Sequence, residues 1–311
     1  YPDHTVYPFC TENEKDFMNL MDVYLNAVFC PNVLTDKEIF EQEGWHFQCE
    51  DGKAPEINGV VYNEMKGAFS SPDGVLDRMI LNSLFPDTTY ANESGGDPDV
   101  IPELTYEEYL NFHRTYYHPS NSYIYLYGNM DMEEKLNFLD EHYLSHFEYL
   151  DVDSVIREQR AFDECRDVTL EYPIAENEGE EDNTYLSYNM IAGNAGDSQM
   201  AMAFEVLDYA LLSAPGAPLK QALLDAKLGK DVYGSYDDGI LQPYFTVIAK
   251  GSNPDRKEEF VSVIRQVLGD IVKNGIDKKA VEAGINYFEF RYREADFSSY
   301  PMGLMYSLDI L

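Results

Sequence analysis

The residues best placed to do chemistry surround Glu64, in the stretch "GVVYNEMKG" at positions 59 to 67. At helical spacing Glu64 lies on one apolar stripe with Ile57, Val60, Val61, Met65 and Ala68. An ionised carboxylate that faces a core needs a cationic partner or a metal, because its burial is otherwise costly. The pattern therefore predicts an inward Glu64 that coordinates a metal or pairs with Arg78 or Lys66, or else a stripe whose end is wet.

The histidines offer weaker candidates. None of the six completes an H-E-x-x-H or H-x-x-E-H zinc motif. His142 and His146 have the ligand spacing of four, but no glutamate stands between them in "EHYLSHFEY", which favours a surface or packing role. His113 and His118 flank a helix end that Pro119 marks. No nucleophile elbow, phosphate-binding loop or dinucleotide fingerprint is present.

Alternating helices and strands must position Glu64. Before it, we predict a strand in "DHTVYPFC", a helix capped by Thr11, a second helix from Thr35 and an extended "WHFQCED". After it, a helix recapped near Ser71 leads into the long loop "DTTYANESGGDPDVIPE". That loop exceeds the usual connection length, so it is either a binding loop or a packed Ω-type loop.

The later elements divide into two units. The first, residues 1–150, closes with a helix in "LTYEEYLNFHRTYY", a strand in "SYIYLYGN" and a helix in "DMEEKLNFLDEHYLSHF". Residues 151–183 lose periodicity and contain the acidic run "ENEGEED", which predicts a linker. The second unit, residues 184–311, has a strand, two helices, two strands around a Gly-rich turn, and two more helices.

The helices of the two units can be aligned. "KDFMNLMDVYLNAVF" matches "EEFVSVIRQVLGDIV", which places Phe17 over Phe260, Leu25 over Leu268 and Phe29 over Val272. Two tandem α+β units are the economical explanation. Amphipathic helices also resemble one another by chance, so the alignment needs support from elsewhere.

Composition limits the classes of function. A chain of 311 residues with 44% hydrophobic content can form two domains. The 57 acidic and 22 basic residues give a charge of −35, which disfavours nucleic acids and anionic membranes as partners. No apolar run is long enough to span a membrane, and no signal-peptide pattern opens the chain. We expect buried free thiols, in a reducing cytoplasm, at Cys10, Cys30, Cys49 and Cys165.

Several of these stretches carry a resemblance to a known family. "DHTVYPF", "GVVYNEMKGAF" and "SGGDPDVIPELTYEEYLNFHRTYYHPSNSYIYLYGN" resemble the presequence-protease branch of the insulinase-like (pitrilysin, M16) zinc metallopeptidases. The resemblance is specific over residues 1–150 and looser beyond them. It implies an α+β fold of two tandem homologous sandwich domains, a catalytic first domain truncated at its N-terminus and a non-catalytic second domain. Both ends of the chain look like cuts through structure.

The resemblance also assigns a role to Glu64. It implies that Glu64 is the distal zinc ligand and that two histidine ligands and a general-base glutamate belong to an H-x-x-E-H motif upstream of Tyr1. Two imidazoles and one carboxylate hold Zn²⁺ with an open position, where the metal acidifies its bound water. We therefore expect this chain to bind zinc poorly and cleave nothing, while its parent cleaves short unstructured peptides together with a C-terminal half. The alternative is a non-catalytic peptide-binding or assembly module.

Overall fold

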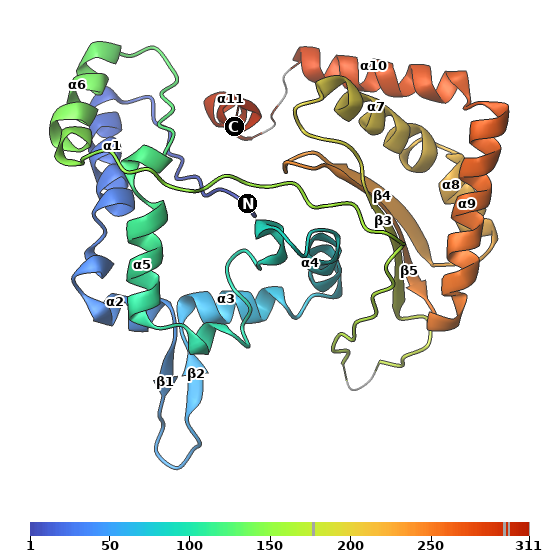
Figure 1. Ribbon diagram of the computed structural model, residues 1–311, viewed down its shortest axis with the longest axis horizontal. Helices are drawn as coiled ribbons and strands as arrows, with labels where there is room; N and C mark the ends of the chain where they lie inside the picture. Colours follow the sequence, from blue (N-terminus) through green and yellow to red (C-terminus); the bar gives the residue numbers. More distant parts are fainter. Residues whose placement is uncertain (176–177, 295–296, 298, 311) are drawn as a thin grey trace.

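The computed structural model describes residues 1–175, 178–294, 297 and 299–310 of the 311. Two groups of elements lie side by side and are joined by an irregular segment that crosses between them (Figure 1). The first group contains α1 (Glu14–Phe29), α2 (Lys37–Glu43), β1 (His46–Gln48), β2 (Glu56–Asn58), α3 (Val60–Ala68), α4 (Pro72–Leu84), α5 (Tyr106–Tyr116) and α6 (Met132–His142). The second contains β3 (Thr184–Ile191), α7 (Ser198–Asp208), α8 (Pro218–Asp225), β4 (Asp231–Asp237), β5 (Tyr244–Ser252), α9 (Lys257–Asn274), α10 (Lys278–Glu294) and α11 (Met302–Ile310).

Local capping explains where several helices begin. Asn13, rather than the predicted Thr11, caps α1 by accepting a hydrogen bond from the Asp16 amide. A reciprocal capping box between Thr105 and Glu108 starts α5, so two amide groups that lack helical partners are satisfied together. Sequence periodicity located these helices correctly, while the exact capping residue depended on the local chain path.

A sheet in the order β3-β5-β4 forms the centre of the second group. Its strands are antiparallel, with Val247 of β5 opposite Tyr188 and Gly234. Alternate residues of β5 enter different cores: Val247 packs in a cluster with residues of α8 and α9, whereas Ile248 packs with Ile80 of α4. Helices therefore cover both faces of the sheet, and β5 is buried on both sides. Figure 1 shows α4 on one side of the strands and α7, α8 and α9 on the other.

The core around α4 crosses the predicted division between the units. Residues 151–175 and 178–183 contain no helix or strand, as the loss of periodicity predicts, and Glu176 and Asn177 of the acidic run lie outside the described residues. The segment is nevertheless anchored at Gln159, which is 4% exposed. Its side-chain oxygen accepts a hydrogen bond from the Asp87 backbone amide at 2.9 Å, and its backbone amide donates to the Gln242 side-chain oxygen at 2.5 Å. The boundaries at 150 and 184 stay predictions.

Two predicted strands are wrong. Residues 3–10 and 122–129 form no strand, and neither stretch pairs with another strand in the described part of the chain. A strand is stabilised by ladder hydrogen bonds to a neighbour, so an alternating pattern alone does not create one. Tyr123, in the second of these stretches, is 90% exposed. The predicted extended segment after Trp45 does form β1, which pairs with β2, and Ile57 belongs to β2 rather than to the helical stripe.

Two expectations about burial are also wrong. All four cysteines are exposed rather than buried. The alignment of the units puts Phe29 over Val272, yet Phe29 is 6% exposed and Val272 is 87% exposed. The tandem relation stays a prediction, and the two residues of this aligned pair differ in burial. None of the helices in the described ranges combines the length and the apolar character that a membrane crossing requires.

Candidate functional site around Glu64

Helix α3 carries Glu64 and starts at a backbone position that only glycine fits. Gly59 has φ +151°, and a Cβ there would lie 2.3 Å from the Gly44 carbonyl oxygen. That same oxygen accepts a hydrogen bond from the Tyr62 amide at 3.3 Å. The Asn58 side-chain oxygen accepts from the Gly59 amide at 2.8 Å and from the Asn63 side chain. These contacts fix the first turn of α3 against the chain that enters β1.

Glu64 itself is exposed, so the prediction that it faces inward is wrong. Neither predicted ion-pair partner reaches it: Arg78 pairs with Glu93 at 2.7 Å, and Lys66 lies over the Tyr62 ring. In the described structure α3 has no buried residue. The apolar stripe that suggested burial is only partly covered in the described structure, and Val60 and Val61 beside Glu64 are exposed.

Two exposed apolar side chains lie beside Glu64 on α3. Val60 and Val61 are 47% and 38% exposed, and they lie four and three positions before Glu64, on the same side of the helix. Met65, one position further, turns instead toward Gly95 of the long loop. Glu64 therefore stands on a small apolar surface that is open in the described structure.

The long loop between α4 and α5 is packed, which is one of the two predicted alternatives. Tyr90 is 1% exposed and Ile101 is 4% exposed. The Tyr90 hydroxyl donates to Asp3 at 2.8 Å and accepts from the Leu241 amide at 2.9 Å, which connects the N-terminal segment, the loop and the second sheet. Sequence reasoning missed this connection, because nothing in the sequence indicates that Tyr90 would meet a turn 151 residues later.

One further ion pair joins the two groups and was not predicted. Lys250 of β5 donates to Asp73 of α4 at 2.8 Å, and Tyr233 donates to the same carboxylate at 3.4 Å. The hydrogen bond to Asp73 raises the pKa of Lys250. A hollow of about 680 Å³ adjoins this pair between the C-terminal end of β5 and the joining segment. The pair links the units, and Glu64 does not line the hollow.

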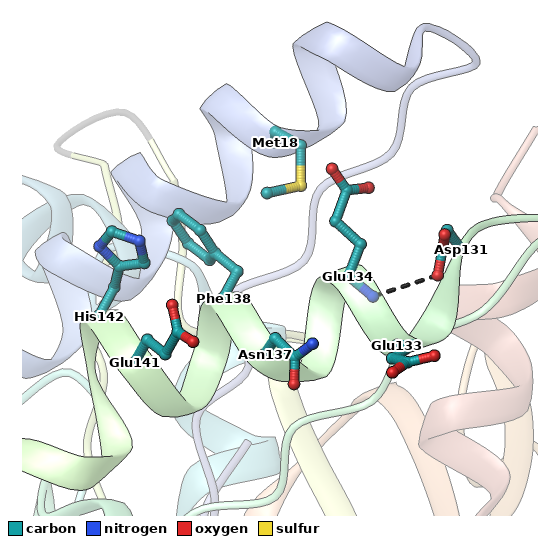
Figure 2. Close-up of a pocket in the computed structure, with 8 residues that line it drawn as sticks. All are labelled: Met18, Asp131, Glu133, Glu134, Asn137, Phe138, Glu141 and His142. Atoms are coloured by element: carbon teal, nitrogen blue, oxygen red, sulfur yellow. Dashed lines mark hydrogen bonds between the residues drawn. The ribbon is translucent and has the colours of Figure 1, made fainter.

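A second groove, with mostly acidic and polar lining residues, lies elsewhere, between α1 and α6. Figure 2 shows Glu134, Phe138 and His142 along one side of α6, facing Met18 of α1. The groove of about 510 Å³ is lined by Met18, Asp131, Glu133, Glu134, Asn137, Phe138, Glu141 and His142. His142 stacks on Phe138 with ring centroids 4.5 Å apart, so it has the packing role predicted for it.

Two other histidines also have structural roles. His113 is 8% exposed and bonds the Val28 carbonyl at 2.9 Å through its ring nitrogen. The His118 ring accepts from the Ser120 amide and so caps a short 3-10 turn. His146 is exposed. No described histidine lies in a metal-binding group with Glu64.

The donor chemistry at Glu64 suits one ligand of a shared metal site. A catalytic zinc ion takes three protein ligands and keeps a fourth position for water. In the described part of the chain, no three His, Cys, Asp or Glu side chains gather where they would hold a metal ion together. Glu64 supplies a single exposed carboxylate, so any other donors would come from beyond the described residues.

Comparison with known proteins shows which family the chain resembles. The family model described as the peptidase M16 inactive domain matches residues 103–288. Protein HypA of Clostridium perfringens is 53% identical over 100% of this chain and 32% of its own length. Presequence protease 1 of Arabidopsis thaliana, chloroplastic/mitochondrial, is 40% identical over 98% of this chain and 28% of its own length. The chain thus spans about a third of the length of these curated relatives.

Solved structures agree on the fold. The peptidase M16 inactive domain of Pseudomonas fluorescens superposes with a TM-score of 0.58 at 15% identity, over 95% of this chain and 64% of that one. The periplasmic protease PqqL of Escherichia coli gives 0.54 at 14% identity, over 96% and 31%. The family match covers more than half of the chain, the relatives include presequence proteases, and the mixed α+β fold is the one these structures have. This chain belongs to the peptidase M16 family.

Proposed function

We propose that this chain is part of a zinc-dependent endopeptidase that degrades short unstructured peptides, and that Glu64 is one of its zinc ligands. The observation that carries the proposal is the exposed carboxylate of Glu64 on an apolar surface with Val60 and Val61. Such a surface suits a covering segment that brings further ligands. Zinc, when bound, would supply a water acidified to a pKa near 7 for peptide hydrolysis.

The proposal assigns the remaining ligands to sequence upstream of Tyr1. The resemblance in "NEMKG" supports two histidines and a general-base glutamate in an H-x-x-E-H motif there. The 311-residue chain then lacks two of three ligands and has no hydrolytic activity of its own. The strongly acidic composition favours basic peptides through electrostatic steering, which added salt would weaken.

A peptidase assay with a matched pair of variants tests the proposal. The polypeptide extended upstream to include the histidine motif should cleave an unstructured peptide, and a zinc chelator should stop it. Glu64→Gln should abolish the activity, whereas Glu107→Gln, at an exposed position on α5, should leave it unchanged. Activity that survives both the chelator and Glu64→Gln would reject the assignment.

A second candidate is a peptide-binding or assembly module without chemistry. The family description of residues 103–288 as an inactive domain favours it for that stretch, which includes most of the second unit. We propose that this unit pairs with another M16 half, and the fold similarity to the first half of PqqL, with a TM-score of 0.52, supports such an arrangement. An extended polypeptide that binds peptides stoichiometrically but never cleaves them would favour this candidate over the first.

We also propose a cytoplasmic location. The four exposed cysteines form no disulfide in the described residues, and exposed free thiols persist best in a reducing compartment. Fractionation of the source cells followed by mass spectrometry would test this, and recovery only from an oxidising compartment would contradict it.

A further inference from the structure

Arg78 of α4 holds the C-terminal end of the helix that carries Glu64. Its guanidinium donates to the Ala68 carbonyl at 3.4 Å and lies over the Phe69 ring, 4.1 Å from the centroid. Ala68 is the last residue of α3 and Phe69 is its C-cap. The guanidinium also donates to the Gly74 carbonyl at 3.3 Å and to Glu93 at 2.7 Å. One side chain thus joins α3, α4 and the packed loop.

Helix α3 depends on such end contacts more than most helices do. It has nine residues, which is too short for stable helix formation in isolation. It has no fully buried residue in the described structure, so packing of an apolar face fixes it only in part. Its last carbonyl groups lack helical partners, as at every helix end. The Gly44 carbonyl holds the first turn. At the last turn the Ser70 hydroxyl donates to the Gly67 carbonyl at 2.6 Å, and Arg78 is the side chain that ties this turn to α4 and the loop.

Glu93 holds the guanidinium in place from the other side. The side chains of Arg78 and Glu93 are only 16% and 15% exposed. Burial raises the pKa of Glu93, and the charge of Arg78 opposes that rise. The same loop packs Gly95 against the sulfur of Met65, beside Glu64 in sequence. The loop and Arg78 therefore grip α3 while Glu64, about 100° around the helix from Met65, stays exposed.

We infer that Arg78 is a positioning residue for Glu64: with Glu93 it fixes the end of α3 and so the direction of the Glu64 carboxylate. The inference rests on the proposed function, in which that carboxylate is a zinc ligand. Partners that orient a metal ligand typically contribute a factor of about 10 to 100 in metal affinity. A lysine would keep the charge beside Glu93 but lose the planar contacts with Phe69 and Ala68.

Hydrogen exchange in the 311-residue chain tests the positioning directly. In Arg78→Met, amides of residues 60–69 should exchange about tenfold faster or more, while those of α9 keep their protection. Arg78→Lys should recover only part of the protection. Arg114→Met, which removes an exposed arginine from α5, is the matched control and should change nothing. The inference is overturned if Arg78→Met leaves α3 unchanged, if α3 and α9 accelerate equally, or if Arg78→Lys restores protection completely.

Zinc titration separates this inference from the proposed function. In the polypeptide extended to include the histidine motif, Arg78→Met should weaken Zn²⁺ affinity about 10- to 100-fold, and Glu64→Gln should weaken it further. If Glu64→Gln leaves the affinity intact, the proposed function fails whatever Arg78 does. If Glu64→Gln loses zinc and Arg78→Met does not, the proposed function stands and the positioning role is overturned.

Discussion

Replacement of Tyr90 by phenylalanine should destabilise the protein measurably although it changes only one atom. The hydroxyl accepts from the Leu241 amide at 2.9 Å and donates to Asp3 at 2.8 Å, at a residue that is 1% exposed. The phenylalanine ring keeps the edge contact with Phe85, 5.4 Å between centroids. Asp3 retains its contact with His4, but the Leu241 amide loses its partner. An unpaired buried donor costs about 1 to 3 kcal/mol, so we expect a loss of about 2 kcal/mol.

Urea unfolding followed by fluorescence of Trp45, the single tryptophan, measures this loss. The urea concentration at the unfolding midpoint should fall. The dependence of the unfolding free energy on urea should stay the same, because the surface that becomes exposed on unfolding does not change. Tyr123→Phe, at a tyrosine that is 90% exposed, is the control and should stay within about 0.5 kcal/mol. If Tyr90→Phe also stays within that limit, the hydroxyl does not hold the two groups of elements together and the reasoning is wrong.

Alkaline pH gives the same prediction a second readout. Burial raises the pKa of Tyr90 above its ordinary value of 10, so the folded state favours the neutral phenol. Stability from this group is fully present below pH 10 and is lost as the pH rises and the unfolded chain ionises first. The alkaline decline in stability should therefore be smaller in Tyr90→Phe than in the wild type. Parallel declines would contradict this.

Three other perturbations have equally definite outcomes. One oxygen of Asp208 is buried without a partner in the described structure, and burial raises the pKa of this carboxyl. The ionised carboxylate present at neutral pH is therefore costly to bury, and Asp208→Asn should raise the free energy of unfolding by about 1 kcal/mol. This gain should shrink as the pH falls and the wild-type carboxyl is protonated; exposed Asp140→Asn is the control, and a gain that is independent of pH would count against the explanation. Ile264→Ala should lower the free energy of unfolding by about 2 to 5 kcal/mol, because this side chain is 0% exposed. Val272→Ala should change it almost not at all, because that side chain is 87% exposed, and equal effects in denaturant unfolding would contradict the described core. All four cysteines should react with a maleimide in the native chain, as mass spectrometry would show, and any that reacts only in denaturant is buried after all.

The fold was predictable where a segment carries its own signal. The helices later observed as α1, α4, α9 and α10 have strong amphipathic periods, and the strands around the Gly-rich turn have turn residues between apolar runs. Residues 3–10 and 122–129 alternate just as well but have no strand partner in the described chain, so their pattern misled. Periodicity reports which side chains a segment would bury, whereas strand formation also depends on a neighbour.

The identity of the candidate site stays a prediction, whereas the predicted environment of Glu64 was wrong. The motif "NEMKG" led to Glu64, yet the expected burial was wrong because the described residues leave Glu64, Val60 and Val61 exposed. Arg78 was considered as a partner of Glu64 and instead pairs with Glu93, fifteen positions along the chain. Contacts of this kind depend on how a long loop folds back, which local spacing does not encode. The length of this loop and its two adjacent glycines, Gly95 and Gly96, which both have positive φ, were the available sequence signal that the loop folds back.

Zinc titration of the two polypeptides tests the central claim most directly. The 311-residue chain should bind no zinc stoichiometrically, because Glu64 is the one ligand that we propose within this sequence. The polypeptide extended upstream through the histidine motif should bind one zinc ion, and Glu64→Gln should lose it. Stoichiometric zinc on the 311-residue chain, or undiminished zinc on the extended Glu64→Gln variant, would contradict the assignment of Glu64 as a ligand completed from outside this sequence.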